Sequence, residues 1–362
     1  MKHLHVLALP CLMAALLLSG CSQKDADAYV GEQITSLKEK DTDTYSDFLQ
    51  SGIDESNQQY VLQFPDKLKE SYIQLLKTSL QSVQFEVANA KEKKNNIYEV
   101  EVSFNPIDIQ KTLKSANASL ISKTTAETLE EAGKDIFKQD LKIIKDTPKY
   151  SDEITTTIEV KKKGDNFSID RKSLKALLDQ ALLNDMEPYT SLCELYDAKD
   201  FLTAYLDASF KGEITQFAKH TDRTKEEALS WYEGDVFSAP DDLSSAYKER
   251  YTLALKNILK QSRYTVHVPR KEQGLMNYTI SVTTTPNNSL VTAYQEFESG
   301  TYYSIDEASR ALVEKLEHYA ASPVYGDETT TDISLNGHTL LDSGNEDSEL
   351  QKLGTIICPM PE

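Results

Sequence analysis

The amino-acid sequence predicts an α+β fold in which one domain, made of helices and a four-stranded antiparallel sheet, occurs twice in tandem. The stretch PKYSDEITTTIEV at 148–160 returns as PVYGDETTTDISL at 323–335, with seven identities over the first eleven positions. Upstream of each stretch, a helical pattern gives way to segments in which apolar and polar residues alternate. This change of period within each copy indicates the α+β class, and its recurrence indicates an internal duplication.

Each copy has a helix whose apolar residues are spaced four apart. The first stripe is Phe64, Leu68, Tyr72, Leu76 and Leu80, and the second is Leu243, Tyr247, Tyr251, Leu255 and Leu259, at a constant offset of 179. Steps of four drift slowly around a helix of about 3.6 residues per turn, so each stripe forms one apolar face. Less regular helical segments, 29–49 and 201–218, precede the two stripes.

Two strands follow each helix, and we expect them to pair as an antiparallel hairpin. The alternating segments are 83–87 and 98–104 in the first copy and 264–268 and 278–282 in the second. Each second strand stops at a proline, Pro106 or Pro286, which lacks the N–H group that a sheet needs. The alternation indicates a sheet with one buried and one solvated face.

A long helix and two more strands complete each copy. The predicted helices are 125–146 and 305–321, and they begin at capping-box patterns, Thr124 with Glu127 and Ser304 with Glu307. The repeated stretch then leads into a third strand, 154–160 or 329–335. A fourth strand is expected near 167–169 or 340–341, and a helix over 174–182 closes the first copy.

The order helix, helix, strand, strand, helix, strand, strand resembles the NTF2-like or cystatin-like class of cone-shaped α+β domains. The resemblance implies helices packed on one side of the sheet. The predicted copies span 28–183 and 196–362, and NDMEPYTSL lies in a predicted linker at 184–195.

The N-terminal segment predicts export and a lipid anchor. Its apolar run, Val6 to Leu18, has thirteen residues, which is too short to cross a bilayer core of about 30 Å. The following Leu-Ser-Gly-Cys resembles the lipobox of bacterial lipoproteins, and together with the duplication it resembles uncharacterised lipoproteins of Gram-positive bacteria. This resemblance implies that residues 1–20 are removed as a signal peptide, that Cys21 is lipidated, and that 21–27 tether the protein to the outer face of the cell membrane. The alternative is an ordinary secretory signal in which Cys21 is incidental.

The charge excludes one class of partner. The formal net charge is −19, and it becomes 38 − 58 = −20 once Lys2 leaves with the signal. Nucleic acid is therefore not expected as a partner, because its binding depends on Lys and Arg that neutralise phosphates. With 39% hydrophobic residues the chain is able to form cores.

Cys193 and Cys358 are the two cysteines that remain after Cys11 and Cys21 are set aside. They lie near the two ends of the second copy, and disulfides persist in exported proteins. The sequence leaves two alternatives open, a disulfide between them or two separate buried thiols.

Candidate ligand-binding residues are few. Paired acids stand at the same place in both copies, Asp152 with Glu153 and Asp327 with Glu328. They could bind a cation or a ligand, but adjacent residues at a strand entrance point to opposite sides, and a solvated turn explains them equally. Trp231 and Tyr232 lie in an insertion that only the second copy has, where they could cap a ligand cavity or pack a short helix onto the domain.

No motif in the sequence predicts catalysis, a metal or a cofactor. The histidines of the processed chain, His220, His267, His318 and His338, do not have the spacing of a zinc site. Gly-rich phosphate loops and nucleophile elbows are also absent from the sequence.

These observations predict a non-enzymatic, extracytoplasmic lipoprotein that binds a small ligand or a surface protein through one of its two domains. One alternative is a substrate-binding lipoprotein of an ABC transporter, although the hairpin order differs from the alternating strands and helices of such lobes. Another is a structural spacer of the cell envelope. An enzyme would require convergent acids or histidines, which the sequence does not show.

Overall fold

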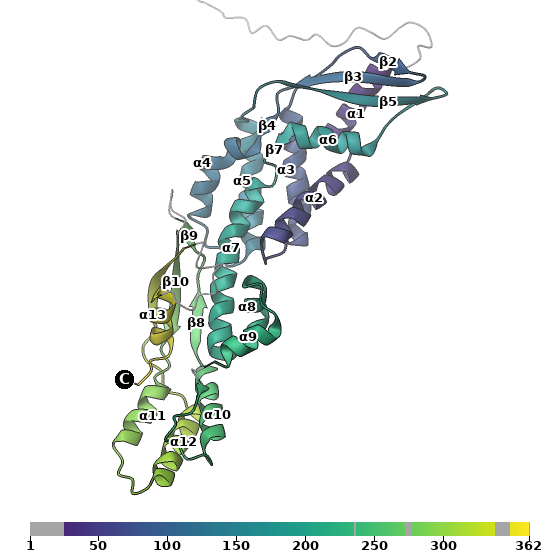
Figure 1. The fold of residues 1–362 in the computed structure, drawn as a ribbon. Helices are drawn as coiled ribbons and strands as arrows, with labels where there is room; N and C mark the ends of the chain where they lie inside the picture. The colour runs from purple at the N-terminus through teal and green to yellow at the C-terminus, as the bar shows by residue number, and fades with distance from the viewer. Residues whose placement is uncertain (1–24, 235–236, 272–276, 337–347, 362) are drawn as a thin grey trace, which may run out of the picture.

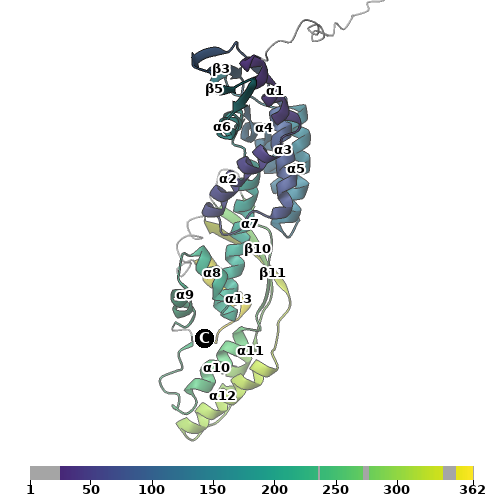
Figure 2. The same cartoon turned by 90° about the vertical axis from the view of Figure 1, so that its right-hand side faces the viewer.

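The computed structural model describes residues 25–234, 237–271, 277–336 and 348–361. Cys21, the predicted signal peptide and the strand expected near 340–341 lie outside the described residues. The fold is α+β, as predicted, and the molecule is elongated (Figure 1). Two views at right angles place α1 (Ala26–Glu39) near one end and α12 (Ile305–Ala321) at the opposite end (Figure 2).

The first unit contains an antiparallel sheet with the strand order β1-β3-β5-β6, in which β2 also pairs with β3, and a separate parallel pair of short strands, β4 and β7. Helix α1 packs against strands β3, β5 and β6 of this sheet. The remaining elements of this unit are α2 (Asp43–Gln59), η1 (Asp66–Leu68), α3 (Lys69–Ser82), β1 (Phe85–Val87), β2 (Lys91–Lys94), β3 (Ile97–Phe104), β4 (Ile107–Asp108), α4 (Ile109–Ile121), α5 (Leu129–Asp146), β5 (Ile154–Lys163), β6 (Asn166–Ile169), α6 (Arg171–Ala181) and β7 (Leu182–Leu183).

The second unit has a corresponding sheet with the order β11-β10-β8, in which β9 also pairs with β10. Its elements besides α12 are η2 (Asp207–Lys211), α8 (Ile214–His220), α9 (Lys225–Tyr232), α10 (Lys248–Leu259), β8 (Arg263–Val266), β9 (Arg270–Lys271), β10 (Asn277–Thr285), α11 (Ser289–Glu298), β11 (Thr329–Asn336) and α13 (Ser348–Ile357). In each unit one central strand, β3 or β10, pairs with three others.

The repeated stretch makes the same hydrogen bonds in both units. Tyr150 bridges Ile107, and Tyr325 bridges Asn287. The hydroxyl of Tyr150 donates to the carbonyl oxygen of Ser82 at the end of α3, and that of Tyr325 donates to Gln261 just after α10, both at 2.9 Å. The stretch therefore ties the chain that leaves the long helix to the end of an earlier helix, which is a structural role.

The predicted linker at 184–195 is not a linker in the structure. Helix α7 (Glu187–Leu206) runs through most of it and past residue 196, where the second copy was expected to begin. Pro188 does not break this helix because it stands in the first turn, where a backbone N–H has no helical partner.

Helix α7 contributes to the cores of both units. Its residues Tyr189, Leu192, Cys193 and Tyr196 lie in the first core, whereas Leu195, Ala198, Leu202 and Leu206 lie in the second. Polar contacts add to this junction, since the Tyr196 hydroxyl donates to the Ala126 carbonyl at 2.6 Å and Asp197 accepts from the Leu62 N–H at 2.9 Å. The two units are therefore joined by one shared helix.

Two further expectations differ from the structure. Helix α5 begins at Leu129 and is capped by Thr128, whose hydroxyl accepts from the Glu131 N–H, so the capping box expected at Thr124 is not the start of the helix. Ser304 caps α12 as predicted. Helices α4 and α11, which follow the two prolines, were not predicted.

Candidate functional site

The four paired acids do not form a common site. Asp152, Glu153, Asp327 and Glu328 are all exposed, and each pair lies in the turn of its own unit, just after the bridging tyrosine. Their recurrence follows from the repeated turn.

Trp231 and Tyr232 pack α9 onto the rest of the second unit. The Trp231 ring lies 4.4 Å from Phe217 of α8 and 5.8 Å from Tyr205 of α7, measured between centroids. Tyr232 is buried against Phe237 at 4.9 Å. Trp231 and Tyr232 therefore pack a short helix onto the domain, which is one of the two alternatives that the sequence left open.

Cys193 and Cys358 are free, buried thiols in the structure. Cys193 lies in the first core and Cys358 in the second. The disulfide alternative is thus not formed, because the shared helix places Cys193 on the side of the first unit. Burial raises the pKa of the Cys193 thiol to about 12 and that of Cys358 to about 11.

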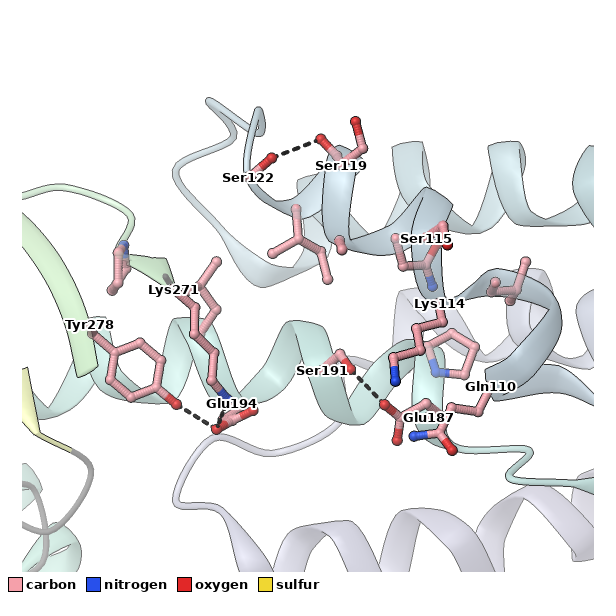
Figure 3. A pocket seen from close by; sticks show the side chains of 17 residues that line it. Gln110, Lys114, Ser115, Ser119, Ser122, Glu187, Ser191, Glu194, Lys271 and Tyr278 are labelled. Carbon is pink, nitrogen blue, oxygen red and sulfur yellow. Dashed lines mark hydrogen bonds and ion pairs between the residues drawn. The ribbon is translucent and has the colours of Figure 1, made fainter. Parts of the chain in front are cut away.

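A pocket of about 510 Å³ lies at the junction of the two units (Figure 3). One wall is α4 of the first unit, a second is the N-terminal half of α7, and the third comes from strands β9 and β10 of the second unit. Both units therefore contribute side chains to one pocket, where the sequence had indicated a site within a single domain.

The α7 wall carries two carboxylates with different surroundings. Glu194 accepts from the Lys271 ammonium at 2.6 Å and from the Tyr278 hydroxyl at 2.5 Å, which joins α7 to the second sheet. Burial and the neighbouring Glu194 raise the pKa of Tyr278 well above its usual value. Glu187 accepts from the Ser191 hydroxyl at 2.9 Å, one turn along the same helix.

The α4 wall is rich in polar side chains. It presents Gln110, Lys114, Ser115, Ser119 and Ser122 to the pocket. Lys114 is exposed and points toward the α7 wall where Glu187 and Ser191 lie (Figure 3). Among the described residues, Lys114 forms no ion pair, so its charge is available to a ligand.

Asn117 also belongs to the α4 wall and is only 6% exposed. Its amide donates a long hydrogen bond of 3.5 Å to the carboxylate of Asp140 on α5, which is fully buried. Within the described ranges, Oδ1 of Asn117 and Oδ1 of Asp140 have no hydrogen-bond partner. Burial raises the pKa of Asp140 to about 7, although the hydrogen bond from Asn117 acts in the opposite direction.

Leu113, Ile121 and Leu195 add apolar surface to these polar walls. The pocket thus offers a cation, carboxylates, hydroxyls and apolar side chains to a ligand. Small-ligand sites have this combination of apolar lining and a few placed polar groups. Among the described residues, no three His, Cys, Asp or Glu side chains are placed to hold a metal ion.

Sequence reasoning missed this site because its walls come from three segments that are far apart in the chain. One signal was present in the sequence. The apolar stripe Leu129, Ala132, Ile136 and Ile144 of α5 is interrupted by Asp140 at the position where a buried residue was expected. A carboxylate in a buried stripe marks a position that needs a polar partner.

Comparisons with known proteins give little further information. No family model matches the chain, and no curated protein matches it. A solved structure described as "a putative lipoprotein (ycdA) from Bacillus subtilis subsp. subtilis str. 168" is 12% identical and has a TM-score of 0.36, covering 76% of this chain and 96% of its own. A TM-score of this size does not establish a shared fold.

Membrane spans were also sought in the described parts of the chain. None of the helices there combines the length and the apolar character that crossing a bilayer requires.

Proposed function

We propose that the protein is a non-enzymatic, extracytoplasmic lipoprotein that binds a small ligand in the pocket between its two units. The observation that carries this proposal is the lining of the pocket, in which the exposed Lys114 of α4 faces Glu187 and Ser191 of α7 across a cavity of about 510 Å³ (Figure 3). Among the described residues Lys114 has no ion-pair partner, so its ammonium group in this partly apolar pocket is available to an anionic group of a ligand.

The walls indicate the chemical class of the ligand. Lys114 would pair with a carboxylate, whereas Glu187 and the serines would accept from or donate to ammonium, amide or hydroxyl groups. The apolar residues between them would contact aliphatic carbon. A small zwitterionic or amide-bearing molecule, such as a short peptide, fits this arrangement.

The anchor and the duplication are part of the same proposal. The lipobox-like residues support lipidation at Cys21 and a position on the outer face of the membrane. The common strand pairing and the equivalent tyrosine bonds support an origin of the two units by duplication. Both larger sheets are antiparallel, and the parallel pairing is confined to the two-residue strands β4 and β7, which argues against the alternative of a transporter lobe with parallel sheets.

Native mass spectrometry of residues 22–362 tests ligand binding directly. The protein is incubated with a metabolite extract and, separately, with a mixture of short peptides. We expect a discrete added mass that is lost in Lys114→Ala. Lys111→Ala is the matched control, because Lys111 is exposed on the same helix but does not line the pocket. A bare mass under both conditions, or an adduct unchanged in Lys114→Ala, would contradict the proposal and favour the spacer alternative.

A further inference from the structure

A second surface lies at the end of the molecule opposite to α1, where α10, α11 and α12 meet (Figures 1 and 2). A groove of about 250 Å³ opens there. Its apolar lining is Pro240, Leu243, Phe297, Ile305 and Leu312. We refer to this groove, together with Tyr303 beside it, as the tip groove.

The tip groove exposes more apolar surface than the fold requires. Tyr303 is 88% exposed and Ile305 is 67% exposed, the two highest values among the large apolar residues that the structure describes. Isolated apolar residues are normal on a surface, but a neighbouring pair beside an apolar groove marks an interaction site. Tyrosine is also enriched among the residues that dominate binding energy at interfaces.

The backbone that carries these two side chains is held in place. Tyr302 folds back and stacks on Phe297 with a centroid distance of 4.9 Å, and its hydroxyl donates to the Phe297 carbonyl. The Tyr303 N–H donates to the Glu307 carboxylate at 3.0 Å, and the Ser304 hydroxyl caps α12. The exposed ring of Tyr303 therefore projects from an ordered turn, which reduces the entropy lost when a partner binds.

Acidic residues are frequent in the segments that form the groove, and Asp242 is the charged residue of its lining. Segments 237–247 and 296–309, which supply most of its lining, contain six acidic residues and no Lys, Arg or His. The acids are Asp241, Asp242, Glu296, Glu298, Asp306 and Glu307, of which Glu296 is paired with Lys315 at 2.7 Å. Of these acids Asp242 lines the groove itself and the other five lie in the neighbouring segments, as does Arg310, which follows Ser309 on α12.

We propose that the tip groove docks a segment of another envelope protein in which apolar side chains are flanked by Lys or Arg. The apolar side chains would contact Tyr303, Ile305 and the groove. The cations would face Asp242 and the acids of the neighbouring segments, which together we call the acidic rim. A second copy of this chain is disfavoured, because two acidic rims would meet in a symmetric contact. Anionic lipid is disfavoured for the same electrostatic reason. If Cys21 is lipidated, α1 lies close to the membrane anchor and the tip groove lies at the far end of the molecule. A partner protein can reach the groove there.

Fluorescence anisotropy with residues 22–362 and a labelled amphipathic peptide of leucine and lysine tests this proposal. We expect the double variant Tyr303→Ser, Ile305→Ser to weaken binding by roughly tenfold or more. Leu229→Ser is the control for loss of an exposed apolar residue, because Leu229 lies on α9 away from the groove and is 43% exposed. Asp241→Asn with Asp242→Asn should weaken binding and reduce its dependence on salt.

Several results would overturn the proposal. If the double variant and the parent bind the peptide with equal affinity, the peptide is attracted by the negative charge of the whole protein and not by the tip groove. Equal affinity for a peptide with glutamate in place of lysine would remove the charge argument. Light scattering that shows a dimer lost in the double variant would identify a second copy as the occupant, and binding to phosphatidylglycerol vesicles lost in the same variant would identify a membrane. None of these results depends on whether the junction pocket binds a small ligand.

Discussion

The buried carboxylate of Asp140 makes the stability of the protein depend on pH in a defined direction. Its pKa is about 7 in the folded protein, compared with 3.8 for the unperturbed group. Between pH 3.8 and about 7 the folded state therefore binds more protons than the unfolded state. The free energy of unfolding falls as the pH rises through this range and stays at the lower value above about pH 7. At 1.36 kcal/mol per pKa unit, ionising Asp140 in the folded protein costs about 4 kcal/mol above pH 8.

Asp140→Asn removes this cost while it keeps the shape of the side chain and an acceptor for Asn117. We expect the variant to exceed the parent in stability at pH 8, and we expect the difference to shrink by about 2 to 3 kcal/mol at pH 5, where the parent is largely protonated at this site. Urea denaturation followed by circular dichroism at the two pH values measures the difference. Asp135→Asn, an exposed position on the same helix, is the control and should show no such change.

The reasoning would be refuted by a stability difference between Asp140→Asn and the parent that is the same at pH 5 and pH 8. A variant less stable than the parent at pH 8 would also refute it, because it would show that the ionised carboxylate is stabilised by its surroundings.

Three other predictions concern packing and the thiols. Tyr325→Phe should lower the free energy of unfolding by about 1 kcal/mol in chemical denaturation, because it removes the hydroxyl that donates to Gln261, and an unchanged value would deny the bond a stabilising role. Trp231→Ala should lower the free energy of unfolding by about 2 to 3 kcal/mol in the same measurement, since the ring packs on Phe217. The variant should still bind a ligand in the junction pocket. A loss of binding without a loss of stability would support the alternative that Trp231 caps a ligand cavity. Cys193 and Cys358 should both react with a thiol reagent only after unfolding, and their failure to react in denaturant without a reductant would reveal a disulfide.

The sequence predicts best those elements whose residue pattern occurs in both copies, because each copy supports the interpretation of the other. Strands β3 and β10 alternate cleanly and end at equivalent prolines, and the predicted bounds of α12 coincide with those in the structure. Helix α4 was missed because its sequence, IQKTLKSANASLI, interrupts its apolar residues with Thr, two Ser and an Asn, which are weak helix formers in isolation. Tertiary contacts with α5 and α7 override that local preference.

The candidate site was harder to predict than the fold. The segment around Pro188 has the composition of a linker, and only its burial in two cores shows that it is a helix. The pocket exists because that helix brings α4 of one unit beside β9 and β10 of the other, and no local pattern contains this information. The aromatic pair in the insertion attracted attention by its composition, whereas its position in the structure is that of packing residues.

Helix α7 also has a mechanical consequence. It has 20 residues and therefore a length of about 30 Å, and it is embedded in both cores. A force applied at the α12 end would pass through a continuous hydrogen-bonded rod and not through a flexible hinge. If the chain is anchored through its N-terminal segment as proposed, pulling on the distal end should reorient the whole body about that anchor, and the two halves should yield together in one extension event.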